Sequence, residues 1–344
     1  MNVLIKNKNY TLQEIGKFGR EGEIYSVIIS PDTKLVKLYD TDRRTAFIQR
    51  KVTAIINKFR YLDLGGVENF IAYPELPVYD SQTKQFCGFL MKYFNSHSNL
   101  FDNKYDLNLS SFRNEEINDD KAIAIISTLF AYLEVLHRAG FILGDINPDN
   151  ILLDKSFMPA IVDFDSAQLG TYYSNTKRQD YIDPSVRIDG YGRKKYFIYT
   201  TDSDIYAMAI VCYEFMVGIH PYFFQTSIPT DTEYKKKNAL SLIDYLENNT
   251  SKTNRFNFEI FVNPAYNASK DRLKEIKINH NNLYQFFKTV FSEGGRYYFG
   301  NKKYDIASKS STEYDSAVAN LIPQSKEDPE ELEMFMKHFK ISLY

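Results

Sequence analysis

The sequence predicts an α+β fold with two lobes, a β-rich amino-terminal lobe and a mostly helical carboxy-terminal lobe. Residues 10–39 combine short apolar runs with three glycines, which is typical of strands joined by tight turns. Residues 115–138 and 202–217 carry the long apolar patterns of helices, and a glycine follows each. The loop between these two helices contains acidic residues and an asparagine, so we expect the functional site there.

The boundaries of the parts follow from changes in these patterns. The 344 residues exceed one average domain and suit two lobes of one unit, at residues 1–94 and 95–324, with a tail helix at 325–344. The tail is acidic and then amphipathic, so it either packs on the lobe or binds a partner protein, and packing is the simpler interpretation. Weaker patterns predict helices at 239–247 and 282–292.

Composition and charge exclude several classes of partner. Lys and Arg number 42 against 44 for Asp and Glu, so the net charge of −2 favours neither a nucleic acid nor an anionic membrane as partner. Cys87 and Cys212 both lie inside apolar runs, which argues against a disulfide framework and fits a reducing compartment. The most apolar stretch, residues 205–213, is too short to span a membrane, so we expect a cytoplasmic protein.

Three glycines near the amino terminus follow the pattern G-x-x-G-x-x-G, at Gly16, Gly19 and Gly22. Glycines let a backbone approach phosphate groups closely and present N–H donors to them, and Ile24 would then cover an adenine ring. Lys37 follows in a strand with apolar neighbours, where its ammonium would reach the α- and β-phosphates. A glycine hairpin without a ligand would explain the glycine pattern alone equally well.

Residues 43–60 are predicted to form an amphipathic helix, because apolar residues recur there at helical spacing. The helix is also rich in basic residues with no acidic residue between them, namely Arg43, Arg44, Arg50, Lys51, Lys58 and Arg60. Such a set is either a solvated basic face or a docking surface for an acidic partner protein, and the solvated face is the simpler interpretation.

The segment after residue 140 carries the residues that suggest chemistry. Asp145 and Asn150 lie five residues apart in a loop that contains Pro148, and Asp163 follows two short apolar strands. Phosphoryl transfer from a nucleotide requires a carboxylate beside the attacking hydroxyl, with an amide oxygen and a second carboxylate on Mg²⁺. Two strands joined by acidic turns would explain a lone D-x-x-x-x-N, but the proline, the flanking strands and the spacing to Asp163 together favour the catalytic interpretation.

The helix predicted at residues 202–217 is apolar on all sides, which is typical of a helix at the centre of a lobe. Asp204, near its start, is placed to accept hydrogen bonds from the backbone of the preceding loop. The segment from Thr171 to Thr176 is rich in hydroxyl groups and is either a phosphorylation site or an ordinary surface loop.

Over about residues 10–222 the chain resembles the eukaryotic-type protein kinase superfamily, and within it a bacterial branch found near tellurium-resistance and other stress operons. Four short motifs carry the resemblance to that branch: Glu21-Gly22, Gly144 to Asn150, Asp163 to Ser166 and Gly218 to Tyr222. The resemblance implies binding of ATP and Mg²⁺ and phosphorylation of Ser or Thr, with Lys37 on the phosphates and Asp145 as the catalytic base. It also implies that Asn150 and Asp163 hold the metal.

The resemblance further implies an adenine pocket. Met91, at the end of an apolar strand, would lie at the back of this pocket, and Leu152 would form its floor. The chain after that strand would be the hinge whose backbone hydrogen-bonds the base, and it consists of Lys92, Tyr93 and Phe94.

Several positions depart from the family pattern. The strand lysine normally pairs with a glutamate of the following helix, but no glutamate occurs between Lys37 and Glu68. We therefore expect another partner for Lys37, with Gln49, Glu21, Glu68 and Glu75 as the candidates. Leu143 and Gly144 replace His-Arg, Asn147 replaces a lysine, Asp165 replaces a glycine, and Ser185 replaces a glutamate.

Three hypotheses about function result. The first is an ATP- and Mg²⁺-dependent protein Ser/Thr kinase with a protein substrate, which autophosphorylates in one version of the hypothesis and needs no phosphorylated activation loop because Gly144 replaces the arginine. The second is a pseudokinase that acts as a nucleotide-binding scaffold, based on the missing helix glutamate, Asn147 and Asp165. The third is a small-molecule phosphotransferase, against which Pro184 and the helix with Asp204 argue.

Overall fold

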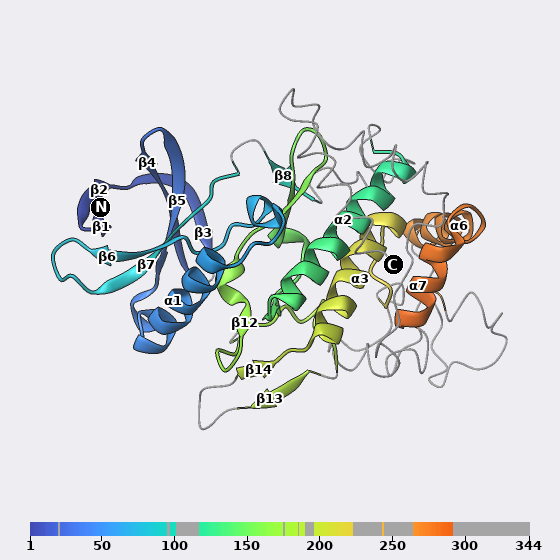
Figure 1. The fold of residues 1–344 in the computed structure, drawn as a ribbon. Helices are drawn as coiled ribbons and strands as arrows, with labels where there is room; N and C mark the ends of the chain where they lie inside the picture. Colours follow the sequence, from blue (N-terminus) through green and yellow to red (C-terminus); the bar gives the residue numbers. More distant parts are fainter. Residues whose placement is uncertain are drawn as a thin grey trace.

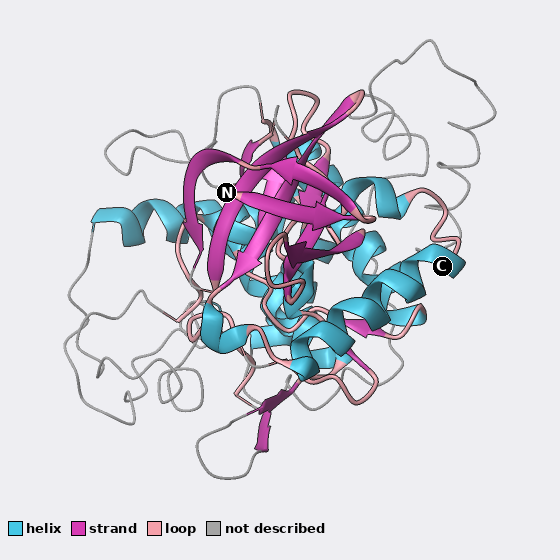
Figure 2. Ribbon diagram, turned by 90° about the vertical axis from the view of Figure 1, so that its left-hand side faces the viewer, coloured by secondary structure: helices cyan, strands magenta, loops and turns pink. Residues whose placement is uncertain are grey.

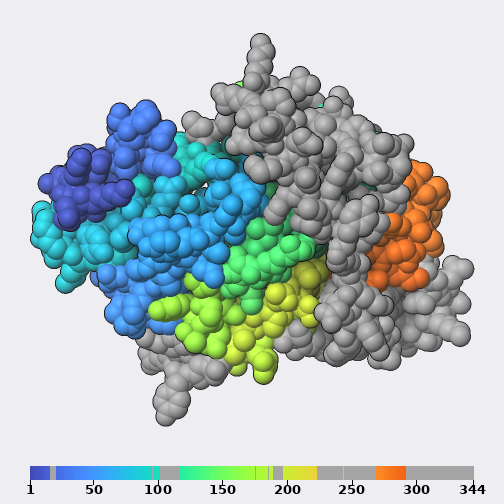
Figure 3. Space-filling model, viewed as in Figure 1, coloured from blue at the N-terminus to red at the C-terminus, as the bar shows by residue number. Residues whose placement is uncertain are grey.

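The computed structural model has two lobes, with most strands gathered in one and most helices in the other (Figure 1). It describes residues 1–19, 21–94, 97–100, 117–174, 176–184, 186–189, 196–222, 243 and 264–291. Figure 3 shows the surface of the strand lobe at the left, in blue to cyan, and residues of the last described helices at the right, in orange. The predicted α+β fold with a β-rich amino-terminal lobe and a helical carboxy-terminal lobe is confirmed.

A seven-stranded antiparallel sheet forms most of the amino-terminal lobe, in the order β2-β1-β6-β7-β5-β4-β3. Lys37 lies on a central strand of this sheet, opposite Ile24 on one side and Phe89 on the other. The β1–β2 hairpin, which turns through positive φ at Lys6 and Asn7, was not predicted. The strands are β1 (Asn2–Ile5), β2 (Lys8–Thr11), β3 (Gln13–Gly19), β4 (Gly22–Ile29), β5 (Asp32–Tyr39), β6 (Leu76–Asp80) and β7 (Phe86–Met91).

Two glycines mark places where neighbouring strands approach too closely for a side chain. A Cβ on Gly22 would lie 2.0 Å from the carbonyl oxygen of Leu38, and a Cβ on Gly88 would lie 2.0 Å from that of Lys37. Gly22, which the sequence suggested as a phosphate-binding glycine, is therefore also required by the packing of β4 on β5. Gly88 has the same role beside Lys37 and lets β7 lie against the strand that carries the lysine.

Helix α1 (Ala46–Tyr61) follows the first five strands and packs on the sheet. It begins three residues later than the sequence predicted, because residues 41–43 form a short 3₁₀ turn, η1 (Thr41–Arg43), and Thr45 caps the helix by accepting a hydrogen bond from the N–H of Ile48. Its buried face contains Val52, Ile55, Ile56 and Phe59, as the helical spacing predicted, and also Lys51.

The carboxy-terminal lobe is built on α2 (Asp119–Arg138) and α3 (Thr201–Val217), which pack against each other. Helix α3 is buried along most of its length and contacts both α6 (Pro264–Asn279) and α7 (Asn281–Phe291), so it lies at the centre of the lobe as predicted (Figure 1). Figure 2, viewed from the side of the strand lobe, shows the strands of the sheet in magenta in front of the helices in cyan. Gly218 ends α3 in the left-handed conformation, with φ of 90°. Helix α7 confirms the helix that the sequence predicted at 282–292.

Short paired strands lie between the long helices of the carboxy-terminal lobe, and 3₁₀ turns occur in both lobes. β10 pairs with β11 and with β8, β12 pairs with β9, and β13 pairs with β14. These strands are β8 (Ser98–Asn99), β9 (Phe141–Ile142), β10 (Ile151–Leu153), β11 (Pro159–Ile161), β12 (Gln168–Leu169), β13 (Arg187–Asp189) and β14 (Tyr196–Ile198). The remaining 3₁₀ turns are η2 (Val67–Phe70), η3 (Pro148–Asn150) and η4 (Phe164–Ser166).

Some predictions concern residues outside the described parts of the chain. They are the tip of the glycine segment at Arg20, the position of Ser185, the helix at 239–247 apart from Ile243, and the tail helix at 325–344. In the parts that are described, no helix combines the length and apolar character needed to cross a bilayer.

Candidate functional site

The loop of residues 143–150, here called the Asp145 loop, is held by the amino terminus of α3. Asp204 accepts hydrogen bonds from the backbone N–H groups of Leu143, at 2.7 Å, and Gly144, at 2.9 Å. Its Oδ2 also lies 2.9 Å from Nε2 of His137 on α2. Asp204 is fully buried, so its two oxygens satisfy donors that have no access to water. The scaffold role predicted for Asp204 is confirmed.

Gly144, which stands in place of the family's arginine, makes room for an aromatic ring. Its φ is 72°, and a Cβ there would lie 2.7 Å from the ring of Tyr199. The hydroxyl of Tyr199 donates a hydrogen bond to the carbonyl oxygen of Thr176 at 2.9 Å. A neutral ring therefore connects the Asp145 loop to the segment around Thr176, where the family has a cation.

Two amide side chains fix the backbone at Asp145. Asn147 and Asn150 each donate a hydrogen bond from Nδ2 to the carbonyl oxygen of Asp145, at 2.9 Å. Asn147 is buried, so it stabilises the loop and does not replace the phosphate contact of the lysine found there in the family. Burial raises the pKa of Asp145, and the nearby charge of Asp163 raises it further.

The turn of residues 163–166, here called the metal turn, joins β11 to β12. Asp163 adopts the left-handed conformation with φ of 59° and ψ of 39°, which aspartate tolerates better than most residues. Phe164 anchors the turn, because its buried ring lies 5.3 Å from that of Phe59 on α1 and 5.2 Å from that of Phe141 on β9. The hydroxyl of Ser166 donates to the carbonyl oxygen of Asp163 at 2.9 Å. These contacts hold the conformation of Asp163 between the two lobes.

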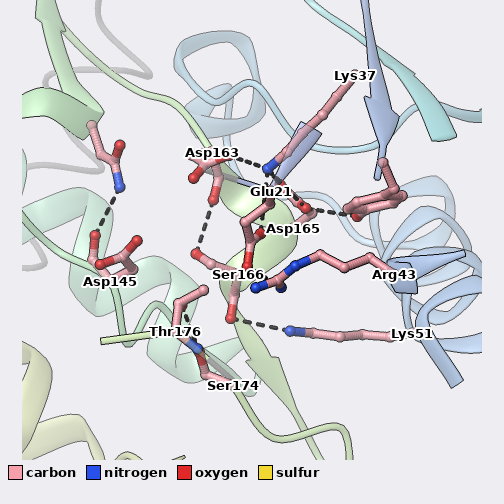
Figure 4. A network of polar contacts seen from close by, with 12 residues as sticks. Glu21, Lys37, Arg43, Lys51, Asp145, Asp163, Asp165, Ser166, Ser174 and Thr176 are labelled. Atoms are coloured by element: carbon pink, nitrogen blue, oxygen red, sulfur yellow. Dashed lines mark hydrogen bonds and ion pairs between the residues drawn. The ribbon is translucent and has the colours of Figure 1, made fainter. Parts of the chain in front are cut away.

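Lys37 reaches the metal turn and pairs with its carboxylates (Figure 4). Its Nζ lies 2.5 Å from Oδ1 of Asp163, 2.9 and 3.1 Å from the two oxygens of Asp165, and 3.7 Å from Oε2 of Glu21. Of the partners considered from the sequence, Glu21 is therefore in reach, whereas Glu75 pairs with Lys34 at 2.9 Å. The closest partners, Asp163 and Asp165, were missed as partners of Lys37.

The basic residues of 43–60 do not form one solvated face: the prediction is wrong for Lys51, and Arg43 and Arg44 precede α1 and bind other parts of the protein. Lys51 is buried and its Nζ donates to the carbonyl oxygen of Ser166 at 3.1 Å. Arg43 forms an ion pair with Glu21, and Nε of Arg44 donates to the backbone at 2.8 Å. We call Glu21, Lys37, Arg43, Lys51, Asp163 and Asp165 the charge cluster; three are carboxylates and three are cations.

The burial of Lys51 could have been read from the sequence. Its position lies three residues after Ile48 and four before Ile55, which places it on the apolar stripe of the predicted helix. The position of Asp165 gave no such signal, because a partner 128 residues away from Lys37 along the chain is not visible in a local pattern.

The environment of the charge cluster shifts several pKa values. Burial opposes the charged form of Lys37, but Asp165, Asp163 and Glu21 together raise its pKa above the ordinary value. Burial lowers the pKa of Lys51 to about 8, although Asp165 acts in the opposite direction. Burial also works against the charge of Asp165, yet Lys37 and the hydroxyl of Tyr39 hold its pKa below the ordinary value. The paired cation and the hydroxyl thus favour the charged form of Asp165.

Apolar residues beside the charge cluster correspond to the expected adenine pocket. Ile24, Met91 and Phe94 belong to one apolar cluster together with Val162, which precedes the metal turn. Leu152 lies between two residues that enter the core of the carboxy-terminal lobe, so its side chain faces the opposite side of β10. The roles of these residues in binding a base stay predictions.

The glycine segment and the hinge are placed as follows. Gly16 lies where the pairing of β3 with β4 shifts register, between Glu14 and Lys17, and Gly19 is paired with Gly22 at the end of the hairpin. Beyond β7 the chain continues outside the sheet as Lys92, Tyr93 and Phe94, so the backbone groups of this stretch are not part of the ladder. Nζ of Lys92 donates to the carbonyl oxygen of Asn69 at 2.6 Å.

The donor set fits a magnesium ion that is shared with phosphates. Asp145, Asn150 and Asp163 line one cavity, whose other lining residues also belong to the carboxy-terminal lobe. Asn150 uses its amide nitrogen on the loop, which directs its oxygen away from that contact, and Asp163 uses Oδ1 for Lys37, which leaves Oδ2. In the described residues no group of three His, Cys, Asp or Glu side chains could hold a metal by itself. Mg²⁺ is commonly held by one or two protein oxygens with phosphate oxygens and water completing the shell, and Asn150 and Asp163 suit that arrangement.

The fold and this site define a class of protein, and comparison with known families agrees. The model of the family described as "Protein kinase domain" matches residues 11–293, which is most of the chain. The chain therefore belongs to the protein kinase family, and the bilobal architecture is that of a protein kinase.

Curated relatives include several protein kinases of eukaryotes. Serine/threonine-protein kinase Genghis Khan of Drosophila melanogaster is 30% identical over 131 residues, which are 36% of this chain and 8% of the relative. Serine/threonine-protein kinase MRCK beta of Homo sapiens is 25% identical over 201 residues, 54% of this chain and 10% of the relative. Serine/threonine-protein kinase PDK1 of Cryptococcus neoformans is 32% identical over 131 residues, 33% of this chain and 10% of the relative. The similarity thus spans a tenth or less of each of these relatives.

Proposed function

We propose that this chain is an ATP- and Mg²⁺-dependent protein Ser/Thr kinase. The observation that supports the proposal most is that Asp145, Asn150 and Asp163 line one cavity and that Lys37 lies 2.5 Å from Asp163. A carboxylate for the hydroxyl, two oxygen ligands for a metal and a cation for the phosphates are the parts that phosphoryl transfer in this family requires. The three relatives described above are named as Ser/Thr kinases, which supports the choice of acceptor.

Each side chain has a distinct role in the proposed reaction. Asp145 accepts the proton of the substrate hydroxyl while the hydroxyl oxygen forms a bond to the γ-phosphorus and the bond from that phosphorus to ADP breaks. Because burial raises the pKa of Asp145, this carboxylate is a stronger base than an exposed aspartate when it is ionised. Lys37 would bind the α- and β-phosphates, and Asn150 and Asp163 would hold Mg²⁺, which would neutralise charge on the transferred group.

The finer parts of the assignment rest on the sequence motifs. Residues 144–150 and 163–166 support a place in the bacterial branch found near stress operons, and with it a cytoplasmic location. Autophosphorylation is proposed at Thr171, which is exposed, whereas the nearby Ser174 is buried and out of reach of a second molecule. The structure leaves Arg50, Lys58 and Arg60 as the part of the basic set on α1 that an acidic partner would meet.

The experiment compares phosphate transfer by wild type, Asp145→Asn and Asp163→Asn, with Asp149→Asn as a matched control on an exposed aspartate of the same loop. Each protein is incubated with Mg²⁺ and ATP labelled at the γ-phosphate, and incorporation is followed by radioactivity and intact mass. Asp145→Asn and Asp163→Asn should each lower the rate about 10²- to 10⁴-fold, and the control should match wild type. Equal transfer by all four proteins would refute the proposal.

A pseudokinase is the second candidate, and one observation favours it. Lys37 is already engaged by two aspartates within 3.1 Å, and no helix glutamate is present to draw it into another position. A protein of this kind would show a higher melting temperature with ATP and Mg²⁺ but no transfer to itself or to a generic acceptor such as myelin basic protein. Transfer by wild type that is lost in Asp145→Asn decides for the kinase.

A further inference from the structure

We propose that Asp165 is the positioning residue for Lys37 and that the contact between α1 and the metal turn has reversed charge, with Lys51 of α1 as its cation. This inference rests on the proposed kinase function and deepens it. In the family a glutamate from this helix orients the lysine. Here the orienting carboxylate comes from the metal turn itself, two residues after the proposed metal ligand.

The contacts of Asp165 are those of a residue that fixes the lysine. Its side chain is 3% exposed, and both of its oxygens lie within 3.1 Å of Nζ of Lys37. Oδ2 also accepts a hydrogen bond from the hydroxyl of Tyr39 at 2.6 Å. Lys37 and Tyr39 are alternate residues of β5, so they project from the same face of the strand. Asp165 is therefore held by two donors of one rigid strand, and it restricts the ammonium in turn.

The contact of Lys51 takes the place that a helix glutamate would occupy. Lys51 is the charged residue on the buried face of α1. Its Nζ donates to the carbonyl oxygen of Ser166 in the metal turn, at 3.1 Å. Figure 4 shows Lys37 and Lys51 reaching the metal turn from the side of the sheet and α1, with Asp145 on the opposite side of the turn. The helix thus contributes a cation and the turn contributes the carboxylate, which is the opposite of the family arrangement.

This arrangement has a consequence for the position of Lys37. When a helix glutamate orients the lysine, movement of the helix releases it. When Asp165 orients it, the position of the lysine depends on the conformation of the metal turn, which Phe164 anchors through Phe59 and Phe141. Short-range contacts of this kind keep a binding group within the small error that catalysis tolerates.

The test restores the family arrangement in two steps. Asp165→Gly installs the glycine of the family and removes the carboxylate from Lys37. Lys51→Glu then supplies a carboxylate from α1 in the double variant. Arg50→Glu combined with Asp165→Gly is the matched control, because Arg50 is exposed on the same helix and the change of charge is identical. Asp165→Asn is included in case Asp165→Gly fails to fold, because asparagine keeps the shape of the side chain and an oxygen that can accept the hydrogen bond from Tyr39.

The measurements are kcat and KM for ATP, together with the Kd of ATP with Mg²⁺ from isothermal titration. Asp165→Asn and Asp165→Gly should each lower kcat/KM about 10- to 100-fold, since they misplace a group that contacts the phosphates. Both variants also remove one partner of a buried ion pair and should lower the melting temperature, so the assays are run well below the unfolding transition of each variant. The double variant with Lys51→Glu should recover at least 10-fold over Asp165→Gly, and the Arg50→Glu control should recover none.

Two results would overturn the inference. One is full kcat/KM in Asp165→Asn or Asp165→Gly, and the other is equal recovery by Lys51→Glu and Arg50→Glu. Failure of the proposed kinase function looks different, because wild type would then transfer no phosphate. Isothermal titration still tests the inference in that case, because it measures ATP affinity without turnover. We expect the affinity to fall in Asp165→Asn and to recover in the double variant.

Discussion

The two sides of the site are held by different kinds of contact. On the helical side, the Asp145 loop is fixed by backbone N–H groups that donate to Asp204 and by two amides that donate to a backbone carbonyl. On the strand side, the charge cluster brings three carboxylates and three cations together at the metal turn and the elements that contact it. The helical side is complete without a ligand, whereas the strand side consists of charges that can exchange partners with phosphates and a metal ion.

This difference separates two tasks. In the proposed reaction, Asp145 acts as the base and needs one position throughout, and neutral or backbone donors provide it independently of what is bound. In the same proposal, Lys37 and Asp163 exchange their mutual contact for phosphate and metal when nucleotide binds, so ionic contacts suit them. We therefore expect ligands to compensate for damage on the strand side and to leave damage on the helical side unchanged.

The largest expected effect is that of Lys37→Met on the strand side. The change leaves Asp163 and Asp165 close together without the cation between them, and we expect the free energy of unfolding to fall by about 4 kcal/mol. Mg²⁺ alone should restore part of this loss, because it can sit between the same carboxylates. Urea unfolding with and without Mg²⁺ measures both effects.

Lys34→Met on the same strand is the control for that variant. Lys34 forms a partly exposed pair with Glu75, so its loss should cost less than about 1 kcal/mol and should not respond to Mg²⁺. A Lys37→Met protein whose stability is indifferent to Mg²⁺ would break the proposed contrast between the two sides.

Asp204→Ala tests the helical side. It leaves the N–H groups of Leu143 and Gly144 without their acceptor in a buried place, and we expect a loss of about 3 kcal/mol that neither Mg²⁺ nor ATP restores. Asp202→Ala removes an acid from the same first turn of α3 but from an exposed position, so it should cost much less. Recovery of the Asp204 variant by ligand would show that this side also depends on what is bound.

Gly144→Ala should have an intermediate effect, through the ring of Tyr199. Alanine is strained in the left-handed conformation, and its Cβ would also displace the ring. We expect the free energy of unfolding to fall by about 2 kcal/mol and the rate of phosphate transfer to decrease. Gly140→Ala is a close control, because φ at Gly140 is 83° and no atom lies within 4 Å of its Cβ. That control should lose about 1 kcal/mol. Equal losses in the two variants would show that the contact with Tyr199 does not contribute to the cost of Gly144→Ala.

The smallest effect is expected for Arg178→Ala, at the edge of the helical side. Arg178 pairs with Asp149 at 2.7 Å, but the two side chains are 35% and 63% exposed. Water and salt screen such a pair, so its loss should change the free energy of unfolding by less than about 1 kcal/mol. A larger change, measured in the same urea titrations, would mean that charge holds the Asp145 loop as well.

Much of the helical side could be predicted from the sequence. Asp145 and Asn150 follow from the pattern of one short loop, and Asp204 follows from the start of a patterned helix, although its contact with Gly144 joins residues 60 positions apart. The role of Gly144 could not be predicted, since the ring that fills its space belongs to Tyr199, which lies beyond a pair of strands.

The strand side could be predicted only in part. The spacing of glycines and strands identified Lys37, and the apolar stripe of α1 placed most of its buried face correctly. The predicted partners of Lys37 were incomplete, because Asp165 was recognised only as a replacement for a glycine and Lys51 only as one of several solvated cations.

The sequence alone determined the order of helices and strands and the identity of the polar groups, because periodicity, capping residues and spacing act over a few residues. Tertiary structure decided which charges meet. The pairing of Lys37 with Asp165 joins residues 128 positions apart, and it exists only because the sheet and α1 close on the metal turn and exclude water from both side chains. Burial of that kind depends on the packing of the two lobes, and no local pattern contains it.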